Sequence, residues 1–315
     1  MRIVSLIASA TEIVHALELT PYQVGRSHEC DYPDEIRSLP VCTAPAIAVD
    51  GSSAEIDALV RERVASAISV YEVSTSVLES LRPTHVVTQT HCRVCAVSLD
   101  DVERALADSV SSRPKLVSLE PNSLHDIWSD IRRVAEACGV TERGDRLVGE
   151  LQSRIEGISA ACRRAKSRPR VACIEWLEPL MASGNWVPEL IDLANGENLF
   201  GEPGGHSPYM TWDQLLASDP DVVIITPCGF DLERAEKEMY WLTDRPDWME
   251  LRAARKDQVY LIDGNQYMNR PGPRVVESLE IIAEILHPDR VASDQTRSFW
   301  TTFPATSVSR KSRPM

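Results

Sequence analysis

Segments of strand type and segments of helical periodicity alternate along this chain in two runs, and one long helical pattern separates the runs. The long pattern covers residues 142 to about 167, with apolar residues at Leu147, Leu151, Ile155 and Ile158. Alternating strands and helices are typical of α/β proteins whose sheets are mainly parallel. The sequence therefore predicts an α/β fold of two lobes, each with a mainly parallel sheet flanked by helices, joined by one long backbone helix.

The same patterns set the expected limits of each part. We expect an N-terminal lobe over 1–140, a connecting helix over 141–168, a C-terminal lobe over 169–290 and a loosely ordered tail over 291–315. The first lobe is predicted to have strands at 3–7, 22–25, 84–88 and 115–119, and helices at 11–19, 53–81, 100–107 and 124–138. The second is predicted to have strands at 171–175, 221–226 and 258–262, and helices at 186–193, 211–217, 232–239 and 275–286.

Charge and composition exclude several classes of partner. The formal net charge of −14 argues against nucleic acid, because phosphate binding requires a basic face. No apolar run approaches the ~18 residues of a membrane span, so membrane insertion is not expected. The apolar start at 3–7 is shorter than the ~7–15 residues of a signal-peptide core, and eight cysteines suit a reducing compartment. These observations predict a cytoplasmic protein without a leader.

Metal-capable side chains gather in short loops that follow predicted strands. In an open α/β sheet such loops face the ligand crevice. Imidazole and thiolate suit cobalt, iron and zinc, so these side chains are candidate contacts for a metal or for a ligand that carries one. The candidates are His28, Cys30, His91, Cys92, Cys95, His206 and Cys228.

The close pair Cys92 and Cys95 leaves three interpretations open: a structural or cleft-lining role, contact with a metal or cofactor, and redox chemistry. A structural zinc site commonly needs two such pairs, and no four of the candidates have that spacing. For His28, a turn held by neighbouring side chains and a ligand contact are equally supported. A large shared ligand therefore explains the candidates better than a zinc site.

The second half adds aromatic and polar candidates. Glu175 and Trp176 end a predicted strand, and Trp186 begins a predicted helix after a turn, where a flat hydrophobic ligand could stack. Polar contacts that would orient such a ligand are expected from Ser9, Glu175, Asn265, Tyr267 and Arg270. The sequence has no Gly-rich phosphate loop, G-x-S-x-G elbow or HExxH motif, which favours a binding protein over an enzyme.

From Arg2 to about Pro288 the chain resembles the helical-backbone class of substrate-binding proteins, which serve ABC importers of vitamin B12, haem and iron-siderophores. The resemblance rests on Val4-Ser5-Leu6, Ala8-Ser9-Ala10-Thr11-Glu12-Ile13, Asn195-Gly196-Glu197-Asn198-Leu199-Phe200, Trp212-Asp213-Gln214-Leu215 and Asp219-Pro220-Asp221-Val222-Val223-Ile224. Within the class the chain looks most similar to the cobalamin-binding group. The resemblance implies two lobes joined by a rigid helix, with the ligand held in the cleft between them.

The expected function is binding of cobalamin or a related corrinoid without catalytic turnover, with His28 or His91 approaching the metal axially. The alternatives are a transition-metal, haem, iron-chelate or zinc carrier and, from a different class, an enzyme that uses Cys92 or Cys95 with His91. The expected partners are the small-molecule ligand and either an ABC importer or an intracellular corrinoid-handling protein.

Overall fold

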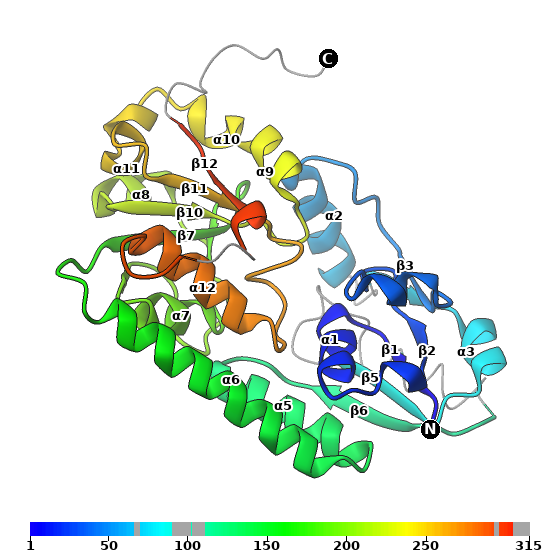
Figure 1. Cartoon of the computed structure of the whole chain (residues 1–315). Helices are drawn as coiled ribbons and strands as arrows, with labels where there is room; N and C mark the ends of the chain where they lie inside the picture. Colours follow the sequence, from blue (N-terminus) through cyan, green and yellow to red (C-terminus); the bar gives the residue numbers. More distant parts are fainter. Residues whose placement is uncertain (66–69, 90–101, 103–110, 293–295, 305–315) are drawn as a thin grey trace. The chain divides into compact units, whose positions relative to one another are not determined.

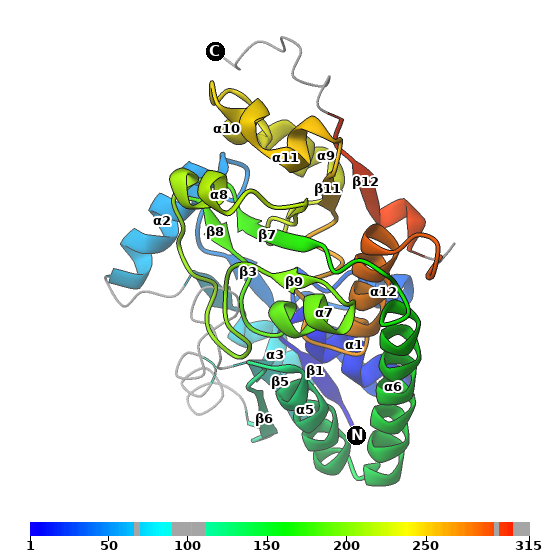
Figure 2. The same ribbon diagram turned by 90° about the vertical axis from the view of Figure 1, so that its left-hand side faces the viewer.

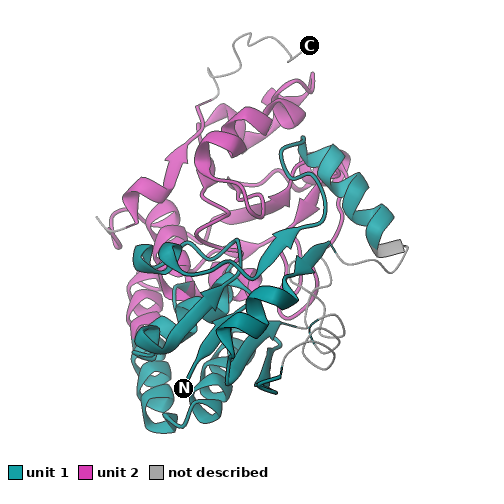
Figure 3. Ribbon diagram, turned by 90° about the vertical axis from the view of Figure 1, so that its right-hand side faces the viewer, with its two compact units in different colours: residues 1–153, 270–274 teal, residues 154–269, 275–315 magenta. Residues whose placement is uncertain are grey.

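The computed structural model describes residues 1–65, 70–89, 102, 111–292 and 296–304 (Figure 1). The chain forms two compact units (Figure 3): unit 1 comprises Met1–Ser153 and Arg270–Arg274, and unit 2 comprises Arg154–Asn269 and Val275–Met315. Both units are α/β with mainly parallel sheets, which confirms the predicted fold class. The chain enters unit 1 twice, and its second visit is the short segment Arg270–Arg274.

The unit 1 sheet has four parallel strands in the order β2-β1-β5-β6. In this order β2 lies beside β1 on the side away from β5, whereas β6 lies beside β5 on the side away from β1. Neighbouring strands whose connections depart in opposite directions open a crevice at their carboxyl ends, which is the usual ligand position in such sheets. The strands are β1 Ile3–Ser5, β2 Gln23–Arg26, β5 His85–Gln89 and β6 Lys115–Leu119.

Helices and one antiparallel pair of short strands complete unit 1. Leu78 of α3 packs with Val4, Leu6 and Val86 of the sheet in one apolar cluster, which fixes α3 against the strands. The elements are α1 Ala8–Ala16, η1 Thr20–Tyr22, η2 Asp34–Ser38, β3 Thr43–Pro45, α2 Ser53–Ala65, β4 Tyr71–Val73, α3 Thr75–Leu81 and α5 Leu124–Ala137.

Two sequence predictions for unit 1 are wrong. The single helix expected over 53–81 is divided into α2, β4 and α3, and β4 pairs antiparallel with β3. Tyr71 and Val73 favour a strand, but so short an apolar run does not distinguish strand from helix. The helix expected from Thr11 begins at Ala8, and Thr11 lies inside it, where its hydroxyl donates to Cys30 Sγ at 3.0 Å.

The long helix α6, Thr141–Cys162, confirms the predicted helical spine, although it ends before the predicted position near 167. The boundary between the units falls within α6, after Ser153. On the unit 2 side Arg154 donates to Glu277 at 3.1 Å and to Glu280 at 2.9 Å. The sequence set this helix apart from both lobes, and that division stays a prediction.

The unit 2 sheet has the order β12-β11-β10-β7-β8, with β9 beside β7. Strands β7, β10, β11 and β9 run parallel, while β8 and β12 are antiparallel to their neighbours. The strands are β7 Arg170–Trp176, β8 Met181–Ala182, β9 Glu197–Asn198, β10 Val222–Ile225, β11 Val259–Ile262 and β12 Trp300–Thr302. The loosely ordered tail expected from 291 is wrong for β12, because a three-residue strand shows no periodicity in sequence.

Helices cover both faces of this sheet (Figure 2). One face carries α8, α9, α10, α11 and η3, whose Trp212, Met239 and Trp248 join the strands in one apolar core. The other face carries α7 and α12. The elements are α7 Val187–Leu193, α8 Trp212–Ser218, α9 Leu232–Glu238, α10 Tyr240–Thr243, η3 Trp248–Glu250, α11 Arg252–Arg255, α12 Val275–Leu286 and η4 Arg297–Phe299. Among the described helices of both units, none is long and apolar enough to cross a membrane.

Asp130 of α5 provides a pH-dependent test of the unit 1 packing. Its buried carboxylate accepts from the Glu120 amide at 2.9 Å and pairs with Arg133. Burial raises the pKa of Asp130 to about 7, against the opposing attraction of Arg133. The folded state therefore keeps a proton that the unfolded state has lost, and the free energy of unfolding falls as pH rises from about 4 to about 7.

We expect this fall to reach at most about 4 kcal/mol, from about 1.4 kcal/mol per unit of pKa shift. Urea unfolding of the wild type and of Asp130→Asn at pH 5 and pH 8 measures it. The Asn variant should show a smaller difference between the two pH values. If the free energy of unfolding changes equally between pH 5 and pH 8 in both proteins, Asp130 is not the group responsible for the change.

Candidate functional site at the carboxyl ends of the strands

The edge of unit 1 at which the strand order predicts a ligand is formed by the carboxyl ends of β1 and β5. Helix α1 follows β1, and its N-cap residue, Ile7, makes no side-chain hydrogen bond to the backbone amides of the first turn. Ser9 lies in that turn, and its buried hydroxyl has no hydrogen-bond partner in the described chain. The same holds for buried side-chain oxygens of Ser5, Thr88 and Gln89. This edge of unit 1 therefore offers hydrogen-bonding groups that the described protein does not satisfy.

His28 follows β2 and is held by a hydroxyl chain. Its backbone amide donates to Thr43 Oγ1 at 3.1 Å, and the Thr43 hydroxyl donates to Ser27 Oγ at 2.9 Å. Because that proton is committed to Ser27, the 2.8 Å contact of His28 Nδ1 with Thr43 Oγ1 requires Nδ1–H as the donor. Nε2 then carries the lone pair. Burial and the nearby Arg26 lower the pKa of His28, which favours this neutral form.

An aromatic ring and a buried carboxylate surround His28. The Tyr71 ring lies 5.3 Å from the imidazole, between centroids, and its hydroxyl donates to Glu29 Oε1 at 2.8 Å. Burial raises the pKa of Glu29, although the Tyr71 hydrogen bond and Arg270 oppose the rise. A neutral imidazole oriented through Nδ1 is the arrangement that metal-binding histidines use. The structure thus presents His28 in a form suited to an axial contact.

Cys30 is placed differently from His28. Its side chain is 1% exposed and accepts the Thr11 hydrogen bond. Burial raises the pKa of Cys30 to about 11, against the opposing hydrogen bonds of Thr11 and the Ser27 backbone. A thiol must lose its proton to ligate a metal. At neutral pH Cys30 is a buried thiol, and its role as a ligand contact stays a prediction.

Arg270 belongs to a buried ion network of four side chains, Glu12, Asp31, Arg270 and Arg274, all in unit 1. Arg270 Nη1 donates to Asp31 Oδ1 at 2.7 Å and to Glu12 Oε1 at 3.2 Å, and Arg274 Nη2 donates to Glu12 Oε1 at 2.5 Å. The Arg270 side chain is 7% exposed and that of Glu12 is 1% exposed. Burial opposes the charge of Arg270, but its hydrogen bond to Asp31 and the attraction of Glu12 raise its pKa.

Sequence reasoning missed Glu12 and Arg274 as members of this network. A signal was present, because α1 is buried from Ala8 through Val14 and Glu12 is the one charged side chain in that buried stretch. A helix that is apolar all round is buried, and a buried carboxylate requires a cation. Which arginine would supply that cation was not evident, since Arg270 and Arg274 lie far along the chain from Glu12.

The unit 2 edge carries a second polar arrangement. Glu175 ends β7, and its Oε2 accepts from the Ser207 hydroxyl at 2.8 Å. Ser207 Oγ in turn accepts from the Gly184 amide at 3.1 Å. A Cβ at Gly184 would lie 2.5 Å from the Ser207 backbone nitrogen, so only glycine permits this approach. The close approach at Gly184 therefore helps to hold Ser207, and through it Glu175, in place.

Beside Glu175 lies an aromatic ledge, formed by Trp176, Phe230 and Arg234. The Trp176 and Phe230 rings are 5.2 Å apart, between centroids, and the Arg234 guanidinium lies 3.8 Å from the Phe230 centroid. Phe230 is fully buried, while Trp176 and Arg234 are partly exposed. Flat apolar ligands bind to such surfaces through stacking. Phe230 and Arg234 were missed in sequence because an isolated Phe after a strand is typical of a core residue.

The remaining predicted residues of unit 2 divide by exposure. Trp186 is buried, with its indole Nε1 donating to the Met268 carbonyl at 2.9 Å, and Tyr267 is buried against Phe299. Asn265 and Cys228 are partly exposed and His206 is exposed. The Cys228 amide donates to the Glu175 carbonyl at 3.2 Å, which places Cys228 beside that part of β7.

Three of the predicted contacts, His91, Cys92 and Cys95, lie outside the described residues. Within the described residues, no group of three or more His, Cys, Asp or Glu side chains is arranged to hold a metal ion. Six cysteines are described, Cys30, Cys42, Cys138, Cys162, Cys173 and Cys228, and each is free of a disulfide.

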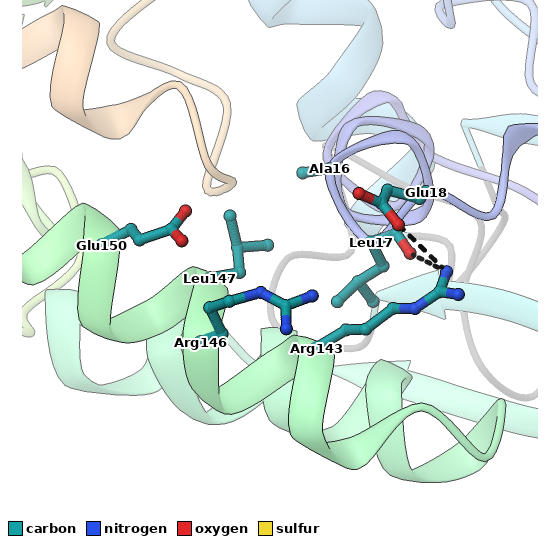
Figure 4. A pocket seen from close by; sticks show the side chains of 7 residues that line it. All are labelled: Ala16, Leu17, Glu18, Arg143, Arg146, Leu147 and Glu150. Carbon is teal, nitrogen blue, oxygen red and sulfur yellow. Dashed lines mark hydrogen bonds and ion pairs between the residues drawn. The ribbon is translucent and has the colours of Figure 1, made fainter.

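A small polar pocket of about 150 Å³ lies elsewhere in unit 1, at the carboxyl end of α1 (Figure 4). Arg143 of α6 donates to the Leu17 carbonyl at 3.2 Å and pairs with Glu18 at 3.4 Å. Arg146 and Glu150 line the same hollow. The pocket is at the opposite end of α1 from Ser9, so it is separate from the edge that carries the predicted contacts.

One family model matches most of the chain. The chain belongs to the family of periplasmic binding proteins, whose family model matches residues 3–266. This confirms the resemblance that the sequence indicated. The family membership defines a two-unit α/β fold used for binding.

Particular relatives are similar over nearly the whole chain. An uncharacterised ABC transporter substrate-binding lipoprotein of Bacillus subtilis is 24% identical over 294 residues, 91% of this chain and 80% of that protein. A vitamin B12-binding protein of Vibrio cholerae is 24% identical over 290 residues, 90% of this chain and 88% of that protein.

Among solved structures, the periplasmic haem-binding protein of Roseiflexus has a TM-score of 0.67 at 23% identity, covering 91% of this chain and 98% of that one. The periplasmic vitamin B12-binding protein of Vibrio cholerae has a TM-score of 0.64 at 20% identity, covering 90% and 96%. These structures share the fold.

The predicted cytoplasmic location is wrong. The relatives are named as a lipoprotein and as periplasmic proteins, which points to a place outside the cytoplasm. The prediction used the short apolar start, but β1 is a buried strand whose length is set by the sheet and carries no information about export. It also used the thiols, yet Cys30, Cys42, Cys162 and Cys173 are buried, and burial protects thiols in any compartment.

Thiol reactivity tests these placements. Burial raises the pKa of Cys30 to about 11 and that of Cys173 to about 12. We expect neither to react with an aromatic disulfide reagent in the native protein at pH 8, whereas the partly exposed Cys228 should react. Peptide mass spectrometry identifies the labelled sites, and protein unfolded in guanidinium is the control, in which all three react. Rapid labelling of Cys30 in the native protein would contradict its burial.

Proposed function

We propose that this protein binds cobalamin or a related corrinoid at the carboxyl ends of its sheet strands, without catalytic turnover, and delivers it to an ABC importer. The aromatic ledge of Trp176, Phe230 and Arg234 beside Glu175 is the observation that carries the proposal. Family membership supports a binding role, and curated relatives named vitamin B12-binding proteins support the choice of ligand.

The chemistry of a corrinoid suits both edges. The face of the ring is apolar and broad, and the ledge offers it an indole and a guanidinium plane. Amide side chains surround the ring, and they both donate and accept hydrogen bonds. Glu175 supplies an anionic acceptor on unit 2, while Ser9 and the first-turn amides of α1 supply donors on unit 1. Asn265 is a further orienting contact in this proposal. That the two edges share one ligand stays a prediction.

Haem is the second candidate ligand, and His28 favours it. An imidazole held through Nδ1, with the lone pair on Nε2, can ligate iron as well as cobalt. Solved structures of the same fold are named haem-binding proteins. Both ligands are metal-centred macrocycles, so the ledge and His28 would serve either one.

Removing the ledge should weaken binding of hydroxocobalamin. Loss of one stacked aromatic ring is worth about 0.5–1.5 kcal/mol beyond its buried area, so Trp176→Ala should raise the Kd about tenfold. Isothermal titration calorimetry with hydroxocobalamin and with hemin gives the comparison.

Trp241→Ala is the matched control for this experiment, because Trp241 lies on α10, is not one of the three ledge residues, and donates to Glu238. It should leave the Kd unchanged. If both variants lose the same amount of affinity, the aromatic ledge is not part of the binding site. If the wild type gives no binding heat with either ligand, the proposed function is wrong.

His28 should act on the metal itself. Hydroxocobalamin has an exchangeable axial water, whereas cyanide blocks that position in cyanocobalamin. We expect a shift of the visible spectrum when the wild type binds hydroxocobalamin and none with cyanocobalamin. His28→Ala should lose the shift but keep its affinity for cyanocobalamin. His15→Ala, whose Nδ1 contacts Thr20, is the control. A shift that persists in His28→Ala would exclude the axial role.

A further inference from the structure

The loop after β11 is continuous with the segment that enters unit 1. Residues 263–269 belong to unit 2 and carry Asn265, and Arg270–Arg274 belong to unit 1. The loop also supports the aromatic ledge, because the Gly264 and Asn265 amides donate to the Phe230 carbonyl at 2.9 and 3.1 Å. A shift of this loop would therefore move the backbone that carries Phe230.

Loop 263–269 lies very close to the chain segment that leads from β10 to Phe230. A Cβ at Gly264 would lie 2.1 Å from the Pro227 carbonyl oxygen, so the backbones touch there. Asn269 Nδ2 donates to the Thr226 carbonyl at 3.2 Å and to the Gly264 carbonyl at 3.0 Å. The loop and the β10 exit are thus one hydrogen-bonded piece of unit 2.

Both ends of the segment Arg270–Arg274 are fixed by the ion network described above. Arg270 joins Asp31 and Glu12, and Arg274 joins Glu12 while stacking 4.1 Å from the centroid of the Tyr32 ring. Between them Pro271 and Pro273 restrict the backbone. A Cβ at Gly272 would lie 3.5 Å from both Glu12 Oε2 and the Ser9 carbonyl oxygen, so the segment packs directly on α1.

We propose that Arg270 is a positioning residue for the ligand: the ion network holds the segment Arg270–Arg274 on α1, and the segment fixes loop 263–269 and, through it, the aromatic ledge. Arg270 was expected to contact the ligand directly. In the structure its guanidinium is directed to two carboxylates of the protein, so its effect on binding passes through the loop. The expected change in ligand affinity rests on the proposed function, whereas amide hydrogen exchange tests the positioning role independently of it.

Arg270→Gln tests the inference by two measurements. Amide hydrogen exchange in peptides that cover 263–269 should accelerate at least tenfold, while exchange in β7 should not change. The Kd for hydroxocobalamin should rise about tenfold. Arg154→Gln is the matched control, since Arg154 also pairs with two carboxylates, Glu277 and Glu280, but on a partly exposed helix surface. It should alter neither quantity.

Unchanged exchange at 263–269 in Arg270→Gln would overturn the proposal, whatever the affinity. If exchange rises throughout Arg270→Gln, a second variant, Asp31→Asn, distinguishes a local effect from general unfolding. It removes only the more exposed carboxylate and leaves Glu12 paired with Arg274. Its effect should be local to 263–269 and about threefold, and no local effect would again overturn the proposal. Failure of the wild type to bind hydroxocobalamin would refute the proposed function while the exchange result still tests the positioning role.

Discussion

The buried carboxylate of Glu12 is the constraint on which much of unit 1 depends. Its side chain is the one acidic group in the buried stretch of α1, and it is acceptable there because Arg270 and Arg274 neutralise it. Removing one partner from such a network typically costs about 3–5 kcal/mol, because the remaining charge is buried and unpaired. A residue near the start of the chain thereby requires two residues about 260 positions later, at the close of the loop that follows β11. The second entry of the chain into unit 1 follows from this requirement.

The two sheet edges differ in the chemistry that they present. Unit 1 offers a neutral imidazole and hydrogen-bond donors, and unit 2 offers an aromatic ledge and the anchored carboxylate of Glu175. A macrocyclic metal chelate has an apolar face, polar substituents and a metal centre, which is the combination that these groups can recognise. Cys30 is a thiol rather than a thiolate at neutral pH, because burial raises its pKa to about 11.

Much of the fold was predictable, because β6 and α12 have the alternation and periodicity expected of a strand and a helix. The short strands β4 and β12 were not, since three residues carry no period. In the candidate site, Glu175 and Trp176 could be proposed from sequence because they lie at the end of a strong strand. Phe230, Arg234 and Arg274 could not, because their roles depend on contacts between distant segments that no local pattern encodes.

Co-elution of cobalt with the protein is the most direct test of whether this chain binds a corrinoid, as we propose. Purified protein is mixed with hydroxocobalamin, passed over a gel-filtration column, and the protein peak is analysed for cobalt and other metals. We expect close to one cobalt per chain in that peak. A protein peak without cobalt, under conditions in which the chain is folded, would contradict it.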